Sequence, residues 1–221
     1  TAKVKVADPG ADPAGDLDRL AAVRDALGPA GRIRVDANGA WDVDTAVRLI
    51  MSYDVAAGGL EYVEQPCATV EELAAVRRRV AVPVAADESL RRSADPLRVS
   101  RLGAADIAVI KVQPLGGVRA AYELAERIGL PVVVSSALET SVGIAAGVAL
   151  AAALPELPYA CGLATVALLA GDVVADPFLP VHGALSVRRP VPDPALLHQW
   201  AADEATAARW RDRMKAVEAL A

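Results

Sequence analysis

The amino-acid sequence predicts an α/β fold, a (β/α) barrel of TIM type with parallel strands inside and helices outside. Short apolar runs alternate with helical patterns along most of the chain, which is typical of a parallel sheet covered by helices. The ends of the predicted strands recur at intervals of roughly 23 to 31 residues. Each of the first six predicted strands ends in a polar or charged residue. In a barrel all strand ends face one mouth, whereas an open sheet binds ligands at a single switch point, so this pattern favours the barrel.

The predicted elements follow one another in a regular order. Strands are expected at residues 2–6, 33–36, 60–64, 82–87, 106–111 and 131–136, and an apolar segment around 159–163 is a candidate seventh strand. Helices are expected at 16–27, 42–55, 69–80, 94–102, 117–128 and 141–154. Thr69 followed by Glu72 predicts a capping box at the start of the third helix.

The pattern changes after Pro190. We expect one barrel domain at residues 1–190 and a C-terminal helical segment at 191–221 that packs on the barrel, with a charged helix from about 193 to 220. Eight strands normally close such a barrel. Seven are counted here, so one strand is expected to be missing in front of the first.

Composition narrows the classes of partner. A net charge of −5 and a pI near 5.1 argue against nucleic acid or an anionic membrane, which leaves a small molecule as the expected partner and the oligomeric state open. The longest apolar run, 142–154, is too short to span a bilayer, and no secretory signal is found. A cytoplasmic protein with Cys67 and Cys161 as reduced thiols is expected, with a single disulfide as the alternative.

Three carboxylates end successive predicted strands: Asp36, Glu64 and Asp87. Closure of the barrel would place them side by side, where they repel one another unless a cation neutralises them. Oxygen-only ligands suit a hard divalent ion, Mg²⁺ before Mn²⁺. The alternative for each carboxylate alone is a helix cap or a surface ion pair. Their matched positions favour the metal site.

Two lysines end strands on either side of these carboxylates. Lys5 ends the first strand and Lys111 the fifth. A lysine in a dry site near another cation can act as a base near neutral pH, and Lys3 would supply that neighbouring charge. A solvated edge strand is the alternative for Lys3 and Lys5.

Several other chemistries are disfavoured. The two histidines, His182 and His198, lie beyond the last barrel unit, so a histidine base on a barrel strand and a Ser-His-Asp triad are not expected. No Walker-type loop or dinucleotide fingerprint occurs in the sequence. Gly116 and Gly117 precede a helix start that could receive an anionic group.

Taken together, these motifs resemble the enolase superfamily, and specifically its two-lysine, muconate lactonizing enzyme-like subgroup. The resemblance covers about residues 2–190 and depends on the order and spacing of five motifs. They are Lys3-Val4-Lys5, Asp36-Ala37-Asn38, Glu64-Gln65-Pro66, Asp87-Glu88-Ser89, and Lys111 followed by Gly116-Gly117.

The resemblance implies a (β/α)7β barrel and a reaction through an enediolate intermediate. It implies that the three carboxylates bind Mg²⁺, that Lys5 removes a proton and then protonates a departing hydroxyl, and that Lys111 stabilises the enediolate. Lys3 would hold the substrate carboxylate and lower the pKa of Lys5. The other residues expected to contact the substrate or to orient the ligands are Asn38, Glu88, Gly116, Ser135 and Ser136.

Segments 135–141 and 161–173 resemble a dehydratase of that subgroup, which implies a lyase that forms an aromatic product from a cyclohexadiene carboxylate. Racemisation or epimerisation of N-acylamino acids or dipeptides is the alternative, although the apolar segment 160–163 counts against dipeptides. A catalytically inactive barrel that acts as a binding partner is the third hypothesis. Enzymes of this family carry an N-terminal capping domain and a first strand, and both are expected to be missing here.

Overall fold

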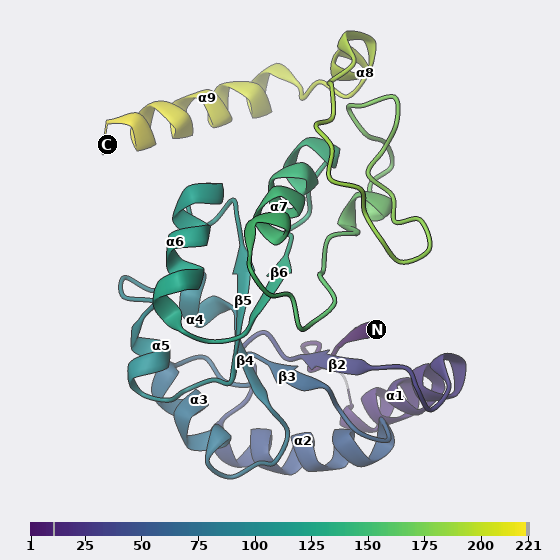
Figure 1. Ribbon diagram of the computed structural model, residues 1–221, viewed down its shortest axis with the longest axis vertical. Coiled ribbons are helices and arrows are strands. Elements are labelled where there is room, and N and C mark those ends of the chain that lie inside the picture. The colour runs from purple at the N-terminus through teal and green to yellow at the C-terminus, as the bar shows by residue number, and fades with distance from the viewer. Residues whose placement is uncertain (11, 220–221) are drawn as a thin grey trace.

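The computed structural model describes residues 1–10 and 12–219. Its centre is a six-stranded parallel sheet in which the strands stand in sequence order (Figure 1). The strands are β1 (Ala2–Lys5), β2 (Ile33–Asp36), β3 (Tyr62–Glu64), β4 (Val84–Ala86), β5 (Ile107–Lys111) and β6 (Val132–Ser135). All six lie within the strands expected from the apolar runs, so the predicted parallel α/β arrangement is confirmed.

Helices cover the outer side of the curled sheet (Figure 1). They are α1 (Pro13–Leu27), α2 (Val43–Ala56), α3 (Val70–Arg77), α4 (Glu88–Arg91), α5 (Arg98–Arg101), α6 (Val118–Ile128) and α7 (Ser141–Ala153), followed by a 3₁₀ turn, η1 (Thr165–Leu168). Helix α6 shows why these segments pack as they do. Its buried residues recur at the spacing of one helical face: Ala121, Leu124, Ala125 and Ile128.

Helix starts depend on polar side chains that satisfy free backbone N–H groups. The predicted capping box is present: the N–H of Glu72 donates to Thr69 Oγ1 at 3.3 Å, and the N–H of Thr69 donates to Glu72 Oε2 at 3.0 Å. The helix expected at 94–102 is present, but only in the second half of that range. Helix α5 begins only at Arg98, after Pro96, and α4 forms earlier, directly behind Asp87.

The seventh strand expected at 159–163 is reduced to a single bridge between Gly162 and Ser135. The N–H of Gly162 donates to Val134 O at 2.9 Å, and the N–H of Ser136 donates to Gly162 O at 2.9 Å. Prolines at 155 and 158 restrict the backbone just before this segment. The sheet is therefore barrel-like, with β1 and β6 as its terminal strands, while the eight-strand (β/α)7β closure and the missing first strand stay predictions.

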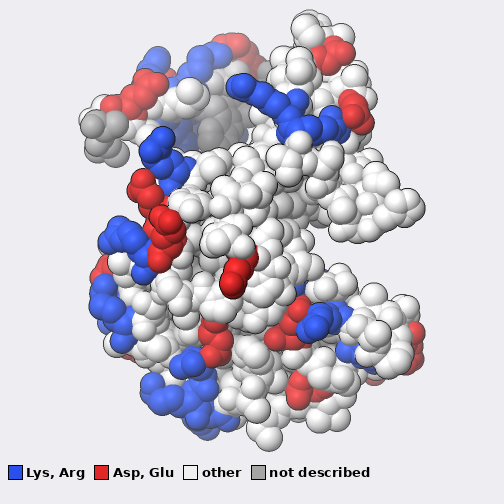
Figure 2. Space-filling model, in the orientation of Figure 1, with Lys and Arg blue, Asp and Glu red and all other residues white. Residues whose placement is uncertain are grey.

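The C-terminal segment contains two helices instead of the one expected at 193–220. Helix α8 (Pro194–Gln199) and α9 (Glu204–Glu218) each start at an aspartate, Asp193 and Asp203, whose side chain accepts the first free N–H groups. Neither helix buries a residue, and Figure 2 shows side chains of both charge signs along α9. Packing of the whole segment 191–221 on the barrel stays a prediction, and residues 220–221 lie outside the described part.

None of the helices in the described residues combines the length and the apolar character needed to cross a membrane.

Candidate active site

The charged residues singled out from the sequence gather at the carboxyl ends of the strands. Lys3 and Lys5 lie on β1, and Lys111 ends β5. In the parallel register, Lys5 stands opposite Asp36, and Asp36 stands opposite Glu64. Because strand ends of one sheet meet at one edge, residues up to 61 positions apart in the chain come within hydrogen-bonding distance.

The three carboxylates lie beneath the surface of this mouth. Asp36 and Asp87 are fully buried, and Glu64 is 1% exposed. Burial raises the pKa of Glu64 to about 7, and repulsion from Asp36 adds to this rise against the opposing effect of Lys3. Burial alone would also raise the pKa of Asp36, but Lys3 and Lys5 outweigh it and lower the pKa.

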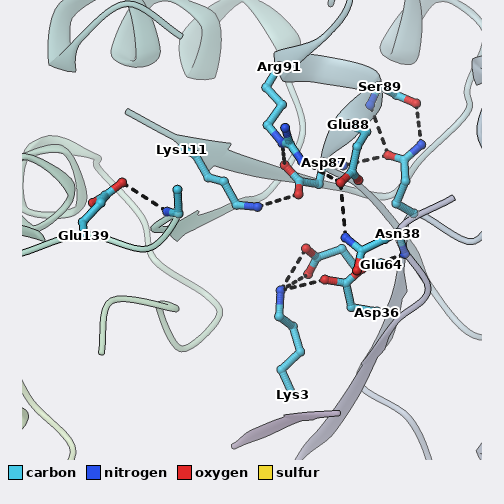
Figure 3. Close-up of polar contacts among 12 residues, drawn as sticks. Lys3, Asp36, Asn38, Glu64, Asp87, Glu88, Ser89, Arg91, Lys111 and Glu139 are labelled. Carbon is cyan, nitrogen blue, oxygen red and sulfur yellow. Dashed lines mark hydrogen bonds and ion pairs between the residues drawn. The ribbon is translucent and has the colours of Figure 1, made fainter. Parts of the chain in front are cut away.

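Lys3 bridges two of these carboxylates (Figure 3). Its Nζ lies 2.9 and 3.0 Å from the two carboxylate oxygens of Glu64 and 3.1 Å from Asp36 Oδ2. Burial alone would lower the pKa of Lys3, but attraction to Glu64 and Asp36 raises it above its ordinary value. Lys3 is thus a cation held between the first two acidic strand ends.

The other two lysines stand on either side of the carboxylate set. Lys5 Nζ donates to Asp36 Oδ2 and, at 2.8 Å, to Asn38 Oδ1, and about half of its side chain is exposed. Lys111 Nζ donates to Asp87 Oδ2 at 2.6 Å and is mostly buried. Two ammonium groups therefore face the same mouth, one accessible and one enclosed.

Asn38 sits in a tight turn directly after β2. Its φ of 47° is left-handed, a conformation that asparagine tolerates better than most residues. Its N–H donates to Asp36 Oδ1 at 3.0 Å and its Nδ2 donates to Glu88 Oε1 at 3.2 Å. Gly39 follows with a φ of 77°, where a Cβ would lie 3.3 Å from Ala68 Cα. The Asp-Ala-Asn-Gly sequence thus fixes both Asp36 and the amide that meets Lys5.

A cavity of about 670 Å³ opens over these groups. Four cations line it, whereas none of its lining residues is acidic, because the three carboxylates lie deeper. Ser135 and Ser136 line it, while Gly116 lies apart, in the turn between β5 and α6, and the contacts of all three with a substrate stay predictions. The cationic residues are Lys3, Lys5, Arg91 and Lys111.

The three carboxylates at these strand ends are the candidate ligands of the predicted divalent metal ion. Within residues 1–10 and 12–219, no three acidic, histidine or cysteine side chains converge into a ready-made metal cluster. The physical reason is visible in the contacts: Lys3 lies between Asp36 and Glu64, and Lys111 binds Asp87. The chemistry of the donors fits nevertheless, because three buried carboxylates that need cations to offset their repulsion are oxygen-only ligands suited to Mg²⁺.

Two residues of the site were missed from the sequence. Gln65 is fully buried, and its Oε1 accepts the N–H groups of Asp87 at 3.0 Å and Ser89 at 3.2 Å. Arg91 Nε donates to Asp87 Oδ1 at 3.0 Å. The spacing of Arg91, four residues after Asp87 on a helical turn, is a signal that could have indicated this pair.

Comparisons with known proteins identify relatives of this chain. Residues 1–193 match the family described as "Enolase C-terminal domain-like". An o-succinylbenzoate synthase of Thermobifida fusca is 72% identical over 189 residues, which are 86% of this chain and 59% of that protein. Another of Mycolicibacterium smegmatis is 57% identical over 220 residues, 100% of this chain and 67% of that protein.

Solved structures of related enzymes have a similar fold. The muconate lactonizing enzyme from Pseudomonas putida superimposes with a TM-score of 0.80 at 26% identity, over 90% of this chain and 57% of that one. An L-Ala-D/L-Glu epimerase from Bacillus subtilis gives 0.67 at 30% identity, over 77% and 49%. The chain spans about 60% of the length of the curated relatives it matches. From its sequence, its fold and its strand-end residues, the chain belongs to the enolase C-terminal domain-like family.

Proposed function

We propose that this chain carries the catalytic barrel of an o-succinylbenzoate synthase, a hydro-lyase of menaquinone biosynthesis. The reaction removes water from 2-succinyl-6-hydroxy-2,4-cyclohexadiene-1-carboxylate and gives o-succinylbenzoate. The observation that carries the proposal is the identity to curated enzymes of that name, 72% over 189 residues and 57% over 220. A mouth lined by four cations also suits a small carboxylate substrate.

Asp36, Glu64 and Asp87 would hold Mg²⁺, with Mn²⁺ as the alternative. Their burial at neighbouring strand ends and their oxygen-only chemistry support this role. When bound, the ion would supply positive charge to the substrate carboxylate and so make the neighbouring C–H bond more acidic. Lys3 contributes a further positive charge beside Asp36 and Glu64.

Lys5 is the proposed acid and base. Its neutral amine would take the proton from the carbon next to the substrate carboxylate, and the resulting ammonium would protonate the hydroxyl as its C–O bond breaks. The proton removed thus leaves with the hydroxyl as water, so no external acid is needed. The half-exposed position of Lys5 in the mouth supports direct access to a bound substrate.

Lys111 is the proposed electrostatic partner on the other side of the mouth. As an ammonium held by Asp87, it would stabilise the negative charge that develops on the substrate carboxylate. Its enclosed position strengthens that interaction, because a charge pair away from bulk water is screened less.

Racemisation of N-acylamino acids is a second candidate, since two lysines that flank one substrate can exchange a proton on either face. The likeness to the L-Ala-D/L-Glu epimerase favours it as chemistry. Segment 160–163 pairs with β6 at Gly162 and offers no acidic group for the ammonium of a dipeptide. Deuterium incorporation into N-succinylamino acids in D₂O would support racemisation, whereas dehydration alone would exclude it.

The test is the dehydration assay on the full chain. We expect turnover that EDTA abolishes and MgCl₂ restores, and we expect Lys5→Ala and Lys111→Ala to lose it at least about 100-fold. Lys215→Ala, on exposed α9, is the matched control and should retain activity. Turnover that persists in EDTA would contradict the mechanism. No turnover together with no Mg²⁺ binding would favour an inactive barrel.

A further inference from the structure

We propose that Arg91 is a positioning residue that joins the two lysines of the site through one continuous chain of polar contacts. The inference rests on the proposed function for the roles of those lysines. It assigns a purpose to a partly buried cation that the proposed reaction does not use directly. The observations that carry it are the contacts of Arg91, their continuation on both sides, and the geometry that only a guanidinium provides.

Arg91 makes two ion pairs at the end of α4. Its Nε lies 3.0 Å from Asp87 Oδ1, and its Nη2 lies 2.6 Å from Glu88 Oε1. The two acids are four and three residues earlier, so one helical turn presents both of them to one side chain. The Arg91 side chain is 21% exposed and lines the mouth, so these are enclosed contacts beside the substrate cavity.

The contacts continue from Arg91 toward each lysine, and Figure 3 shows them as far as Lys111 on one side and Asn38 on the other. On one side, the second oxygen of Asp87 accepts Lys111 Nζ at 2.6 Å. On the other side, Glu88 Oε1 also accepts Asn38 Nδ2 at 3.2 Å, and Asn38 Oδ1 accepts Lys5 Nζ at 2.8 Å. Arg91 is the link between these two halves.

The geometry of the link requires two N–H groups in a fixed relation. Arg91 leaves Asp87 Oδ2 directed at Lys111 by holding Oδ1, while another nitrogen of the same plane fixes Glu88. Glu88 Oε2 is buried without a hydrogen-bond partner in the described residues, so Oε1 alone holds that side chain. A lysine at position 91 would keep the charge but lose the planar fork.

If Arg91 acted only through its positive charge, its removal would change Mg²⁺ affinity in the opposite direction to that expected from a positioning role. Removal of a positive charge beside Asp87 and Glu88 would leave the site more negative and would tighten Mg²⁺ binding. Loss of orientation of Asp87 would weaken it instead. Partners that orient metal ligands typically change metal affinity or activity by about 10- to 100-fold when they are removed.

The experiment compares Arg91→Met, Arg91→Lys and the control Arg92→Met on the full chain. Arg92 is the next residue but does not line the mouth. Calorimetric titration with MgCl₂ in the absence of substrate gives the affinity, and dehydration kinetics give kcat and KM separately. Circular dichroism and urea unfolding identify any variant that does not fold, and Arg91→Lys, the milder change, keeps the test decisive in that case.

We expect Mg²⁺ affinity to fall about 10-fold or more in both Arg91 variants, with kcat reduced more than KM is raised, and the control to match the wild type. Tighter or unchanged Mg²⁺ binding in folded Arg91 variants would overturn the positioning role, as would full rescue by lysine. A wild-type chain that binds Mg²⁺ but does not dehydrate the substrate would instead refute the proposed function, while the affinity comparison would still decide the role of Arg91 toward Asp87.

Discussion

Lys3 binds both carboxylate oxygens of Glu64, at 2.9 and 3.0 Å, from a strand that is not its neighbour in the sheet. Strand β2 lies between them, and its Asp36 shares the same ammonium group at 3.1 Å. A divalent ion at these carboxylates must therefore compete with Lys3 for the same oxygens. This relationship makes Lys3 a stabilising cation when the metal is absent and a neighbour of the metal when it is present.

Lys3→Met should make stability depend more strongly on Mg²⁺. Without the ammonium, the buried carboxylates of Asp36 and Glu64 lose a partner. We therefore expect the free energy of unfolding without metal to fall by roughly 2 kcal/mol. This is less than for a fully buried ion pair, because Lys3 is partly exposed. Urea unfolding with and without MgCl₂ measures this. The gain on adding MgCl₂ should be larger than in the wild type, and an equal gain would contradict the competition.

Gln65→Met should destabilise the turn that carries Asp87. The buried amide makes four hydrogen bonds: its Oε1 accepts from Asp87 and Ser89, and its Nε2 donates to Cys67 O at 2.9 Å and Ser89 Oγ at 2.8 Å. Leaving these groups unsatisfied should lower the free energy of unfolding by about 3 kcal/mol or more.

The measurement for Gln65→Met is urea unfolding, with Mg²⁺ affinity as a second readout that should also fall. Gln113→Met is the control, because the amide of Gln113 lies in a more exposed position and donates to a backbone oxygen, Gly143 O. Its effect should stay near 1 kcal/mol. Equal effects of the two substitutions would show that Gln65 does not hold the turn.

Cys67 should resist thiol reagents in the folded protein. Burial raises its pKa to about 12, so only about one molecule in 10,000 carries the reactive thiolate at pH 8. Cys161, which is partly exposed, should react at least about 100-fold faster. The variants Cys161→Ser and Cys67→Ser isolate each thiol for measurement with Ellman's reagent, and comparable rates would contradict the buried state of Cys67.

The same pKa gives a pH dependence of stability. Above pH 9 the unfolded chain releases the Cys67 proton, while the folded chain retains it until about pH 12. The unfolded state therefore binds fewer protons in this window, and stability falls as pH rises from 9 to 12. Cys67→Ser should reduce that slope.

Gly171→Ala should displace Trp200 without disturbing the barrel. A Cβ at position 171 would lie 2.1 Å from Trp200 Cζ2, so the indole must move, and it is 45% exposed already. In a Trp210→Phe background we expect a red-shifted emission and a change of less than about 1 kcal/mol in stability. Gly15→Ala, where a Cβ meets nothing within 4 Å, is the control, and an unshifted emission would contradict the contact.

The strands were predictable because each carries a local signal, an apolar run that ends in a polar residue. That signal places Asp36, Glu64 and Lys111 at strand ends, where the structure has them. Helix α4 was not predicted, and α5 begins later than the helix expected at 94–102, because Pro96 restricts the backbone of Asp95 before it. The break in the C-terminal helix at Asp203 was also missed. Asp203 caps the start of α9 with its side chain, so a new helix begins there and a single helix does not continue through it.

The polar contacts of the site were less predictable than its members. Sequence spacing indicated that the acids would lie together but not that Lys3 would lie between two of them, since this depends on side-chain reach across β2. Gln65, which follows β3, acts by accepting the backbone N–H groups of Asp87 and Ser89 in the turn after β4. Such contacts are set by tertiary geometry that no local pattern encodes.

The strict sequential order of the strands also has a consequence for how the protein is made. Each strand pairs with the one translated just before it, and every charged group of the site lies between Lys3 and Lys111. Neighbouring βα units can therefore dock as they leave the ribosome, with no need to wait for a distant partner. The cluster that would perform the chemistry is encoded by the first 111 of the 221 residues, and helices made later are not required to bring its members together.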